Sequence, residues 1–119
     1  MYQFKTNFKE EIITDKKHRI FISTLPCASC GTPALSQCAH LKRRGMGYKE
    51  GDNKTLPLCC QRYSINGCHA DSEKKEKTYF EPFGGFDKAM ELAQALYENT
   101  GNREKCLELI RNFRCGMYL

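Results

Sequence analysis

The chain has 119 residues, of which 40 % are hydrophobic and 28 % are charged, and its formal net charge is +5. This length fits one domain with a modest core. No apolar run approaches the roughly 20 residues that a membrane-spanning helix requires, and the first residues lack the apolar centre of a signal peptide. We therefore expect a cytoplasmic protein.

The N-terminal half is expected to combine one helix with two short strands. Residues 1–14 mix charged and aromatic side chains and are expected to form an N-terminal arm, either as a strand or as a loose extended segment. Asp15 is placed to cap a helix over residues 16–22, and Pro26 ends that element. Residues 33–41 have the pattern of a short strand that ends at His40.

A basic loop and a second strand follow. Three glycines among basic residues predict a loop over 42–53. Residues 55–58 have the pattern of a short strand, and Pro57 indicates that the strand lies at an edge or ends there. Residues 59–67 are expected to be irregular.

Helices dominate the C-terminal half of the prediction. A polar helix is expected from Cys68 through Glu73 toward Lys77, before Pro82 and Gly84 break the chain. Two amphipathic helices come next, separated by Gly101 and Asn102. Their apolar stripes are Phe86, Ala89, Ala93 and Leu96, and then Cys106, Leu107, Ile110 and Phe113. The sequence thus predicts one α+β domain, with an arm (1–14), a core (15–80) and C-terminal helices (81–119).

Eight cysteines are unusual for a reducing compartment, where thiols seldom pair. Cys27 and Cys30 have the Cys-x2-Cys spacing of a zinc knuckle, and further cysteines follow downstream. We expect a structural zinc ion bound by Cys27, Cys30, Cys59 and Cys68. Four alternatives stay open: Cys60 or Cys38 replaces a downstream ligand, His40 replaces Cys59, the downstream cysteines are small buried hydrophobic residues without a metal, or the cysteines form a secreted disulfide scaffold.

Two of the three histidines fall beside these cysteines. His40 ends the first strand and His69 follows Cys68. If zinc draws the segments together, one imidazole can serve as a general base and the other can bind a second, catalytic cation. Glu73 lies on the same helical face as His69 and is the expected carboxylate partner, with Asp71 as a weaker one. A purely structural role for these histidines, and a solvated helix face for Glu73, are the alternatives.

Basic residues concentrate near the histidines and favour a polyanionic substrate. The candidate phosphate contacts are Lys42, Arg43, Arg44, Lys49, Lys54 and Arg62.

Four segments together resemble the HNH endonucleases, also called ββα-metal or His-Me-finger nucleases, and are most similar to the small phage- and prophage-encoded branch. The segments are Leu25–Gly31, Cys38–Leu41, Gly45–Asp52, and Leu56–Cys59 with Cys68-His69. The resemblance implies a zinc-stapled hairpin and helix that together surround one divalent cation, Mg²⁺ or Mn²⁺. It also implies an activity, hydrolysis of DNA.

The same resemblance assigns roles to individual residues. His40 matches the general base and His69 the metal ligand of the helix, while Glu73 stands where relatives often have a second histidine or an acid. Asn53 lies near the position of the family's asparagine, offset from the second strand. Ala39 stands where many relatives have another metal ligand. This departure favours an alternative function, a catalytically inactive zinc module that binds nucleic acid. A zinc-scaffolded protein-interaction domain is a third hypothesis.

Overall fold

The computed structural model describes residues 13–33, 35–41, 51–60 and 67–115. Five helices and two strands follow in the order α2 (Lys16–Ser23), β1 (Ser36–His40), β2 (Thr55–Cys59), α3 (Cys68–Lys75), η2 (Glu76–Phe83), α4 (Phe86–Glu98) and α5 (Arg103–Arg114) among these residues. The expected α+β class is confirmed. None of the described helices combines the length and apolar character that a membrane span needs.

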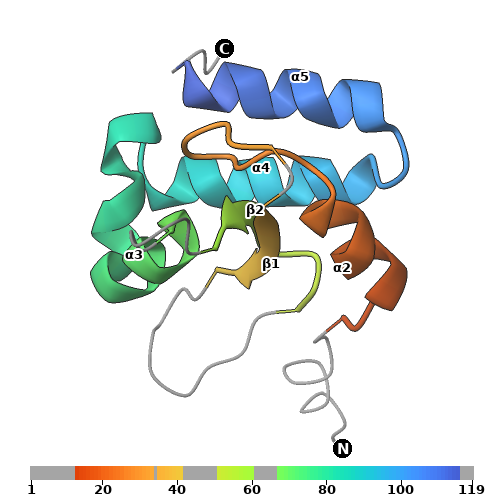
Figure 1. The fold of residues 1–119 in the computed structure, drawn as a ribbon, viewed down its shortest axis with the longest axis horizontal. Helices are drawn as coiled ribbons and strands as arrows, with labels where there is room; N and C mark the ends of the chain where they lie inside the picture. The colour runs from red at the N-terminus through yellow and green to blue at the C-terminus, as the bar shows by residue number, and fades with distance from the viewer. Residues whose placement is uncertain (1–12, 34, 42–50, 61–66, 116–119) are drawn as a thin grey trace, which may run out of the picture.

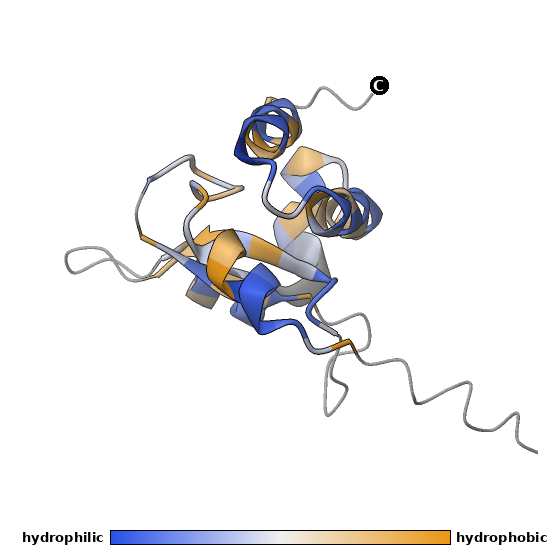
Figure 2. Cartoon of the chain, turned by 90° about the vertical axis from the view of Figure 1, so that its right-hand side faces the viewer, coloured by the Kyte–Doolittle hydropathy of each residue, from blue (hydrophilic) through white to orange (hydrophobic). Residues whose placement is uncertain are grey.

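Helix α2 begins where its capping residue predicts. The Asp15 side chain accepts a hydrogen bond from the backbone N–H of His18 at 3.0 Å, which satisfies one of the free donors of the first turn. The helix changes from hydrophilic over residues 16–19 to hydrophobic over 20–22, as Figure 2 shows. It ends at Ser23, shortly before Pro26.

His18 is fully buried and connects α2 to the turn after α4. The Thr100 hydroxyl donates to the carbonyl of Tyr97 at 2.7 Å, so its one hydrogen is used, and the Nδ1–H of His18 must donate to Thr100 Oγ1 at 2.7 Å. The other nitrogen, Nε2, has no hydrogen-bond partner among the described residues. This histidine is therefore held in its neutral form, and burial lowers its pKa.

Strands β1 and β2 form an antiparallel hairpin in which Ser36 pairs with Cys59 and His40 with Thr55. Every residue of β2 is buried, because the strand contacts α2, α3 and α4. Pro57 lies in the middle of β2, opposite Cys38. In a two-stranded sheet this is still an edge position, as expected, and the carbonyl of Pro57 accepts from the N–H of Ala28 at 2.7 Å.

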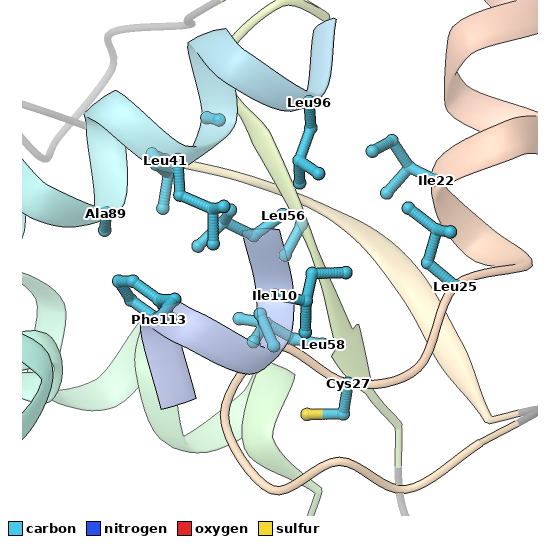
Figure 3. Packing of buried hydrophobic residues seen from close by; sticks show 14 of the residues in the cluster. Ile22, Leu25, Cys27, Leu41, Leu56, Leu58, Ala89, Leu96, Ile110 and Phe113 are labelled. Atoms are coloured by element: carbon cyan, nitrogen blue, oxygen red, sulfur yellow. The ribbon is translucent and has the colours of Figure 1, made fainter. Parts of the chain in front are cut away.

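Helix α4 runs across the hairpin and α5 lies along α4 (Figure 1). Ala89, Ala93 and Leu96 of α4 are buried, as are Cys106, Ile110 and Phe113 of α5, so both predicted apolar stripes are confirmed except that Phe86 and Leu107 are only partly buried. Asn102 caps α5 by accepting from the N–H of Lys105. Figure 3 shows the core converging on Leu56 and Leu58 of β2, with Cys27 at its edge.

The break predicted over Pro82, Gly84 and Gly85 occurs at the two glycines and not at Pro82. Helix α3 ends at Lys75, and η2, a 3-10 helix, continues through Pro82 to Phe83. Gly84, with a φ of 107°, closes it. Phe80 of η2 is almost fully buried and contacts the rings of Phe86 and Phe113. Burial of this ring explains why a segment that contains a proline keeps a helical path.

Candidate metal centre and histidine pairs

The first half of the metal centre is the turn that contains Cys27 and Cys30. The Sγ of Cys27 accepts hydrogen bonds from the backbone N–H groups of Ser29 and Cys30, each at 3.4 Å. The N–H of Gly31 returns to the Cys27 carbonyl at 2.9 Å, and Gly31 has a φ of 82°, which a residue with a side chain seldom adopts. The small residues of this segment therefore allow the turn that was expected from the sequence.

The second half joins the end of β2 to the start of α3. Cys59 is the last residue of the strand and Cys68 the first of the helix, and the N–H of Cys68 donates to the Sγ of Cys59 at 3.4 Å. The long interval between these cysteines is thus closed in space, although the structure describes only part of it. Because Cys59 ends β2 and Cys68 begins α3, both thiols lie beside the turn that contains Cys27 and Cys30.

The Sγ atoms of Cys27, Cys30, Cys59 and Cys68 all lie within 4.8 Å of one another. A tetrahedral zinc ion with bonds of about 2.3 Å places its sulfur ligands about 3.8 Å apart. The Cys30 and Cys59 sulfurs are 3.8 Å apart, which is far longer than a disulfide bond. All eight cysteines are free thiols. The expected quartet therefore lies together and can hold a zinc ion.

The alternative ligands lie outside this cluster. Within the described part of the chain, the four thiols are the one group of three or more histidine, cysteine or acidic side chains close enough to share an ion. Cys60 follows Cys59, so its side chain projects to the other side of the strand, and its N–H bonds to the carbonyl of Leu35. His40 has a different partner, described below.

The four thiols differ in how easily they ionise. Burial raises the pKa of Cys27, Cys59 and Cys68, because a thiolate loses its hydration there. Burial also opposes ionisation of Cys30, but hydrogen bonds from Thr32 and the neighbouring thiols outweigh it and lower its pKa to about 7. A divalent cation would offset the cost of gathering four thiolates, two of which, Cys27 and Cys59, are buried.

Two side chains, those of Tyr79 and Arg114, lie beside the cluster. The Tyr79 hydroxyl lies 2.8 Å from the hydroxyl of Ser29, and burial raises the pKa of this tyrosine, so it stays a neutral hydrogen-bonding group. The Arg114 guanidinium packs against the knuckle, because a Cβ added to Gly31 would lie 2.7 Å from its Cζ. A cation beside a tetrathiolate site reduces the net negative charge of that site.

His40 lies at the other end of β1 and is paired with Asp52, a residue that the sequence analysis did not select. His40 Nε2 is 2.8 Å from Asp52 Oδ1. The second oxygen, Oδ2, accepts from the Asp15 backbone N–H at 2.6 Å and from Arg19 at 2.9 Å. The hairpin register carries the signal for this pair, since Thr55 opposes His40 and Asp52 precedes Thr55 in the turn.

His69 has separate partners. Its Nδ1 lies 2.9 Å from Gln37 Oε1, and its Nε2 lies 3.3 Å from Glu73 Oε2. The expected pairing of His69 with Glu73 is thus present, whereas Asp71 has no resolved bond to it. Gln37 was also missed, although it stands two residues before Ala39 and so on the same face of β1. No hydrogen bond or ion pair joins His40 to His69 among the described residues, and Gln37 and His40, three positions apart, point to opposite faces of β1. One shared groove for the two histidines stays a prediction.

The remaining candidates have less structural support. Asn53 lies in the turn before β2 with its Oδ1 directed back toward Gly51, and its catalytic role stays a prediction. Lys54 is half-buried in the same turn. The other expected phosphate contacts lie outside the described residues: Lys42, Arg43, Arg44, Lys49 and Arg62.

Comparison with known proteins adds no relative, since no family model, curated protein or solved structure matches the chain.

Proposed function

We propose that this chain is a metal-dependent endonuclease of the ββα-metal type, in which a structural zinc ion holds the fold and His40 is the general base. The observation that carries the proposal is the order of elements at the site. A hairpin ends its first strand at His40, and its second strand leads into a helix that bears His69 and Glu73. The cysteine cluster ties this helix to the hairpin.

The reaction would be hydrolysis of a phosphodiester bond. His40 takes a proton from a water molecule, whose oxygen forms the new bond to phosphorus as the bond to the 3′ oxygen breaks. The products carry a 5′-phosphate and a 3′-hydroxyl, and the leaving oxygen takes its proton from solvent. The His40 side chain is 36 % exposed, which leaves the ring accessible to water and substrate.

His69 and Glu73 are the residues that would hold the catalytic cation. Their Nε2 and Oε2 atoms are 3.3 Å apart, close to the roughly 3 Å between neighbouring ligand atoms of an octahedral Mg²⁺ or Mn²⁺ site. One carboxylate and several waters are an ordinary ligand set for Mg²⁺. When bound, the cation would stabilise the negative charge on the phosphate and on the leaving oxygen.

The donor set near His69 also supports the alternative function, a nucleic-acid-binding module without catalysis. Ala39 is buried on the strand face that it shares with Gln37 and offers no ligand atom. The cation would then depend on two protein ligands, and a weak metal site would leave binding without cleavage. The zinc-stapled scaffold would be the same in both cases.

Cleavage of supercoiled plasmid in Mg²⁺ or Mn²⁺ tests the proposal. The wild-type chain should nick the plasmid, and His40→Ala should slow this by roughly 10²–10⁴-fold, the usual contribution of a general base. Glu73→Gln should weaken the response to the cation and require a higher concentration of it. Glu104→Gln is the matched control, since this exposed glutamate lies in the first turn of α5.

Gel retardation in the same buffers separates the two functions. A wild-type chain that retards the plasmid in both cations and leaves it uncut supports the binding module and refutes the nuclease. Cleavage that His40→Ala leaves unchanged refutes the assignment of the base.

A further inference from the structure

We infer that Asp52 is the positioning residue of His40, which fixes the imidazole as the Nε2–H tautomer and leaves Nδ1 as the nitrogen that accepts the proton from water. This inference rests on the proposed function for its chemical meaning. Its structural content, the tautomer and the orientation of the ring, can be measured independently of any cleavage.

The geometry around Asp52 leaves it one available task. The residue is 5 % exposed, and both of its oxygens have hydrogen-bond donors. Oδ2 is occupied by the Asp15 N–H and by Arg19, so the carboxylate cannot turn away from His40. Oδ1 faces His40 Nε2 at 2.8 Å, and within the described part of the chain Asp52 belongs to no group of three or more histidine, cysteine or acidic side chains close enough to share an ion. Asp52 is therefore placed to act on the histidine rather than on a metal ion.

The backbone at Asp52 is held as firmly as its side chain. Its N–H donates to the carbonyl of Ile13 at 2.7 Å, and its carbonyl accepts from the hydroxyl of Thr55 at 3.0 Å. The segment before α2 and the start of β2 are thus both hydrogen-bonded to the backbone of Asp52. Because both backbone groups of Asp52 are hydrogen-bonded, its carboxylate is held in place and can orient the ring that it contacts.

The charges that face Asp52 favour its ionised form. Burial alone would raise its pKa, but the hydrogen bonds from the Asp15 N–H and from His40, with the positive charge of Arg19, outweigh burial and lower it. The negative charge of Asp52 also acts on His18 and Cys38, where it favours the protonated form of each side chain. The Asp15 carboxylate accepts a hydrogen bond from the backbone N–H of His18.

An ionised carboxylate accepts hydrogen bonds and donates none. His40 Nε2 must therefore carry the hydrogen at neutral pH, and the bare lone pair of the neutral ring lies on Nδ1. When Nδ1 takes the proton from water, the ring becomes positively charged and Asp52 stabilises that charge across 2.8 Å. The pair resembles in its logic the histidine–aspartate pair of hydrolases that use a histidine base.

The first test is the nitrogen NMR spectrum of the histidine side chains in the zinc-loaded wild-type chain at pH 8. His40 should show a protonated Nε2 and a bare Nδ1, in one tautomer. Asp52→Asn should give a mixture, because an amide can both accept from and donate to Nε2. A wild-type His40 with its hydrogen on Nδ1, or an unchanged spectrum in Asp52→Asn, overturns the inference.

The second test is a double-mutant cycle of plasmid cleavage. Asp52→Asn should lower kcat by roughly 10²-fold and leave KM nearly unchanged, since a misoriented base forfeits most of the contribution of general-base catalysis. In the His40→Ala background the same substitution should change cleavage by less than about 2-fold. A purely structural role would lower the activity in both backgrounds equally. Asp87→Asn, in the first turn of α4, is the matched control.

The two tests distinguish failure of the inference from failure of the proposed function. A wild-type chain that does not cut DNA but shows the Nε2–H tautomer refutes the nuclease and supports the pairing. A chain that cuts DNA and loses no activity in Asp52→Asn refutes the positioning role and supports the nuclease. If Asp52→Asn does not fold, the wild-type spectrum alone decides the tautomer.

Discussion

Replacing Cys59 by serine should unfold the middle of the chain rather than weaken it slightly. Cys59 is 3 % exposed and joins β2 to the knuckle and to the first residue of α3 through the cluster. Serine removes a thiolate ligand and leaves three thiols without a complete tetrahedral site. Removal of zinc with a chelator should have the same effect on the wild-type chain.

The expected size follows from what the cluster holds together. Structural zinc sites contribute apparent binding energies of about 10–16 kcal/mol, whereas whole domains have stabilities of about 5–15 kcal/mol. The hairpin has two strands of five residues each, and an isolated two-stranded hairpin is marginal in water. A bound zinc ion would therefore contribute about as much free energy as the net stability of a whole domain, and the loss of one ligand should leave little folded hairpin.

Elemental analysis and circular dichroism measure this directly. The wild-type chain should hold one zinc ion, and Cys59→Ser should hold far less and lose its cooperative thermal transition. Cys115→Ser is the matched control, because this exposed cysteine follows α5 and lies outside the cluster. A wild-type chain without zinc, or a Cys59→Ser variant that melts like the wild type, would refute the reasoning.

Two further predictions concern single buried or strained residues. Folding lowers the pKa of His18, so the unfolded state binds more protons than the folded state. The free energy of unfolding should therefore fall as the pH drops below about 6.5, by at most about 1.4 kcal/mol per pH unit. Denaturant unfolding of His18→Leu should lack this component, and subtracting the two pH profiles cancels the zinc contribution common to both; identical slopes would contradict the prediction. Gly31→Ala should cost roughly 1–2 kcal/mol for the left-handed backbone alone. The Arg114→Ala substitution removes the contact with the guanidinium but leaves the backbone cost, so denaturation of Gly31→Ala in that background should still show a loss of stability. Full recovery of stability there would contradict the prediction.

The sequence predicts best where one short-range rule decides the outcome. The capping side chain of Asp15, the periodic stripes of α4 and α5, and the Cys-x2-Cys turn each depend on residues within a few positions of one another. The quartet of thiols could also be named, because a tetrahedral site needs two more sulfurs. The choice of Cys59 over Cys60 then follows from strand alternation once β2 is known.

The missed features depend on distances that run across the fold. Asp52 looks like a turn residue in its local sequence, between a glycine and an asparagine. Its role appears only when the hairpin register sets it near His40 and the docking of α2 brings Arg19 to its other oxygen. The 3-10 path of η2 was missed for a related reason, since Phe80 is buried against Phe113 of α5, far along the chain, as well as against the nearby Phe86.

The hairpin is fastened at both ends by different chemistry, and this bears on how the two proposed roles are linked. The thiol cluster holds the end where Ser36 pairs with Cys59, and the carboxylate of Asp52 holds the end where His40 pairs with Thr55. In the proposed nuclease, a bound zinc ion would set where α3, and with it His69, lies against β1, whereas Asp52 would set the direction of the His40 ring. On this proposal the cysteines would determine whether the site forms, and Asp52 would determine which nitrogen of His40 meets the substrate.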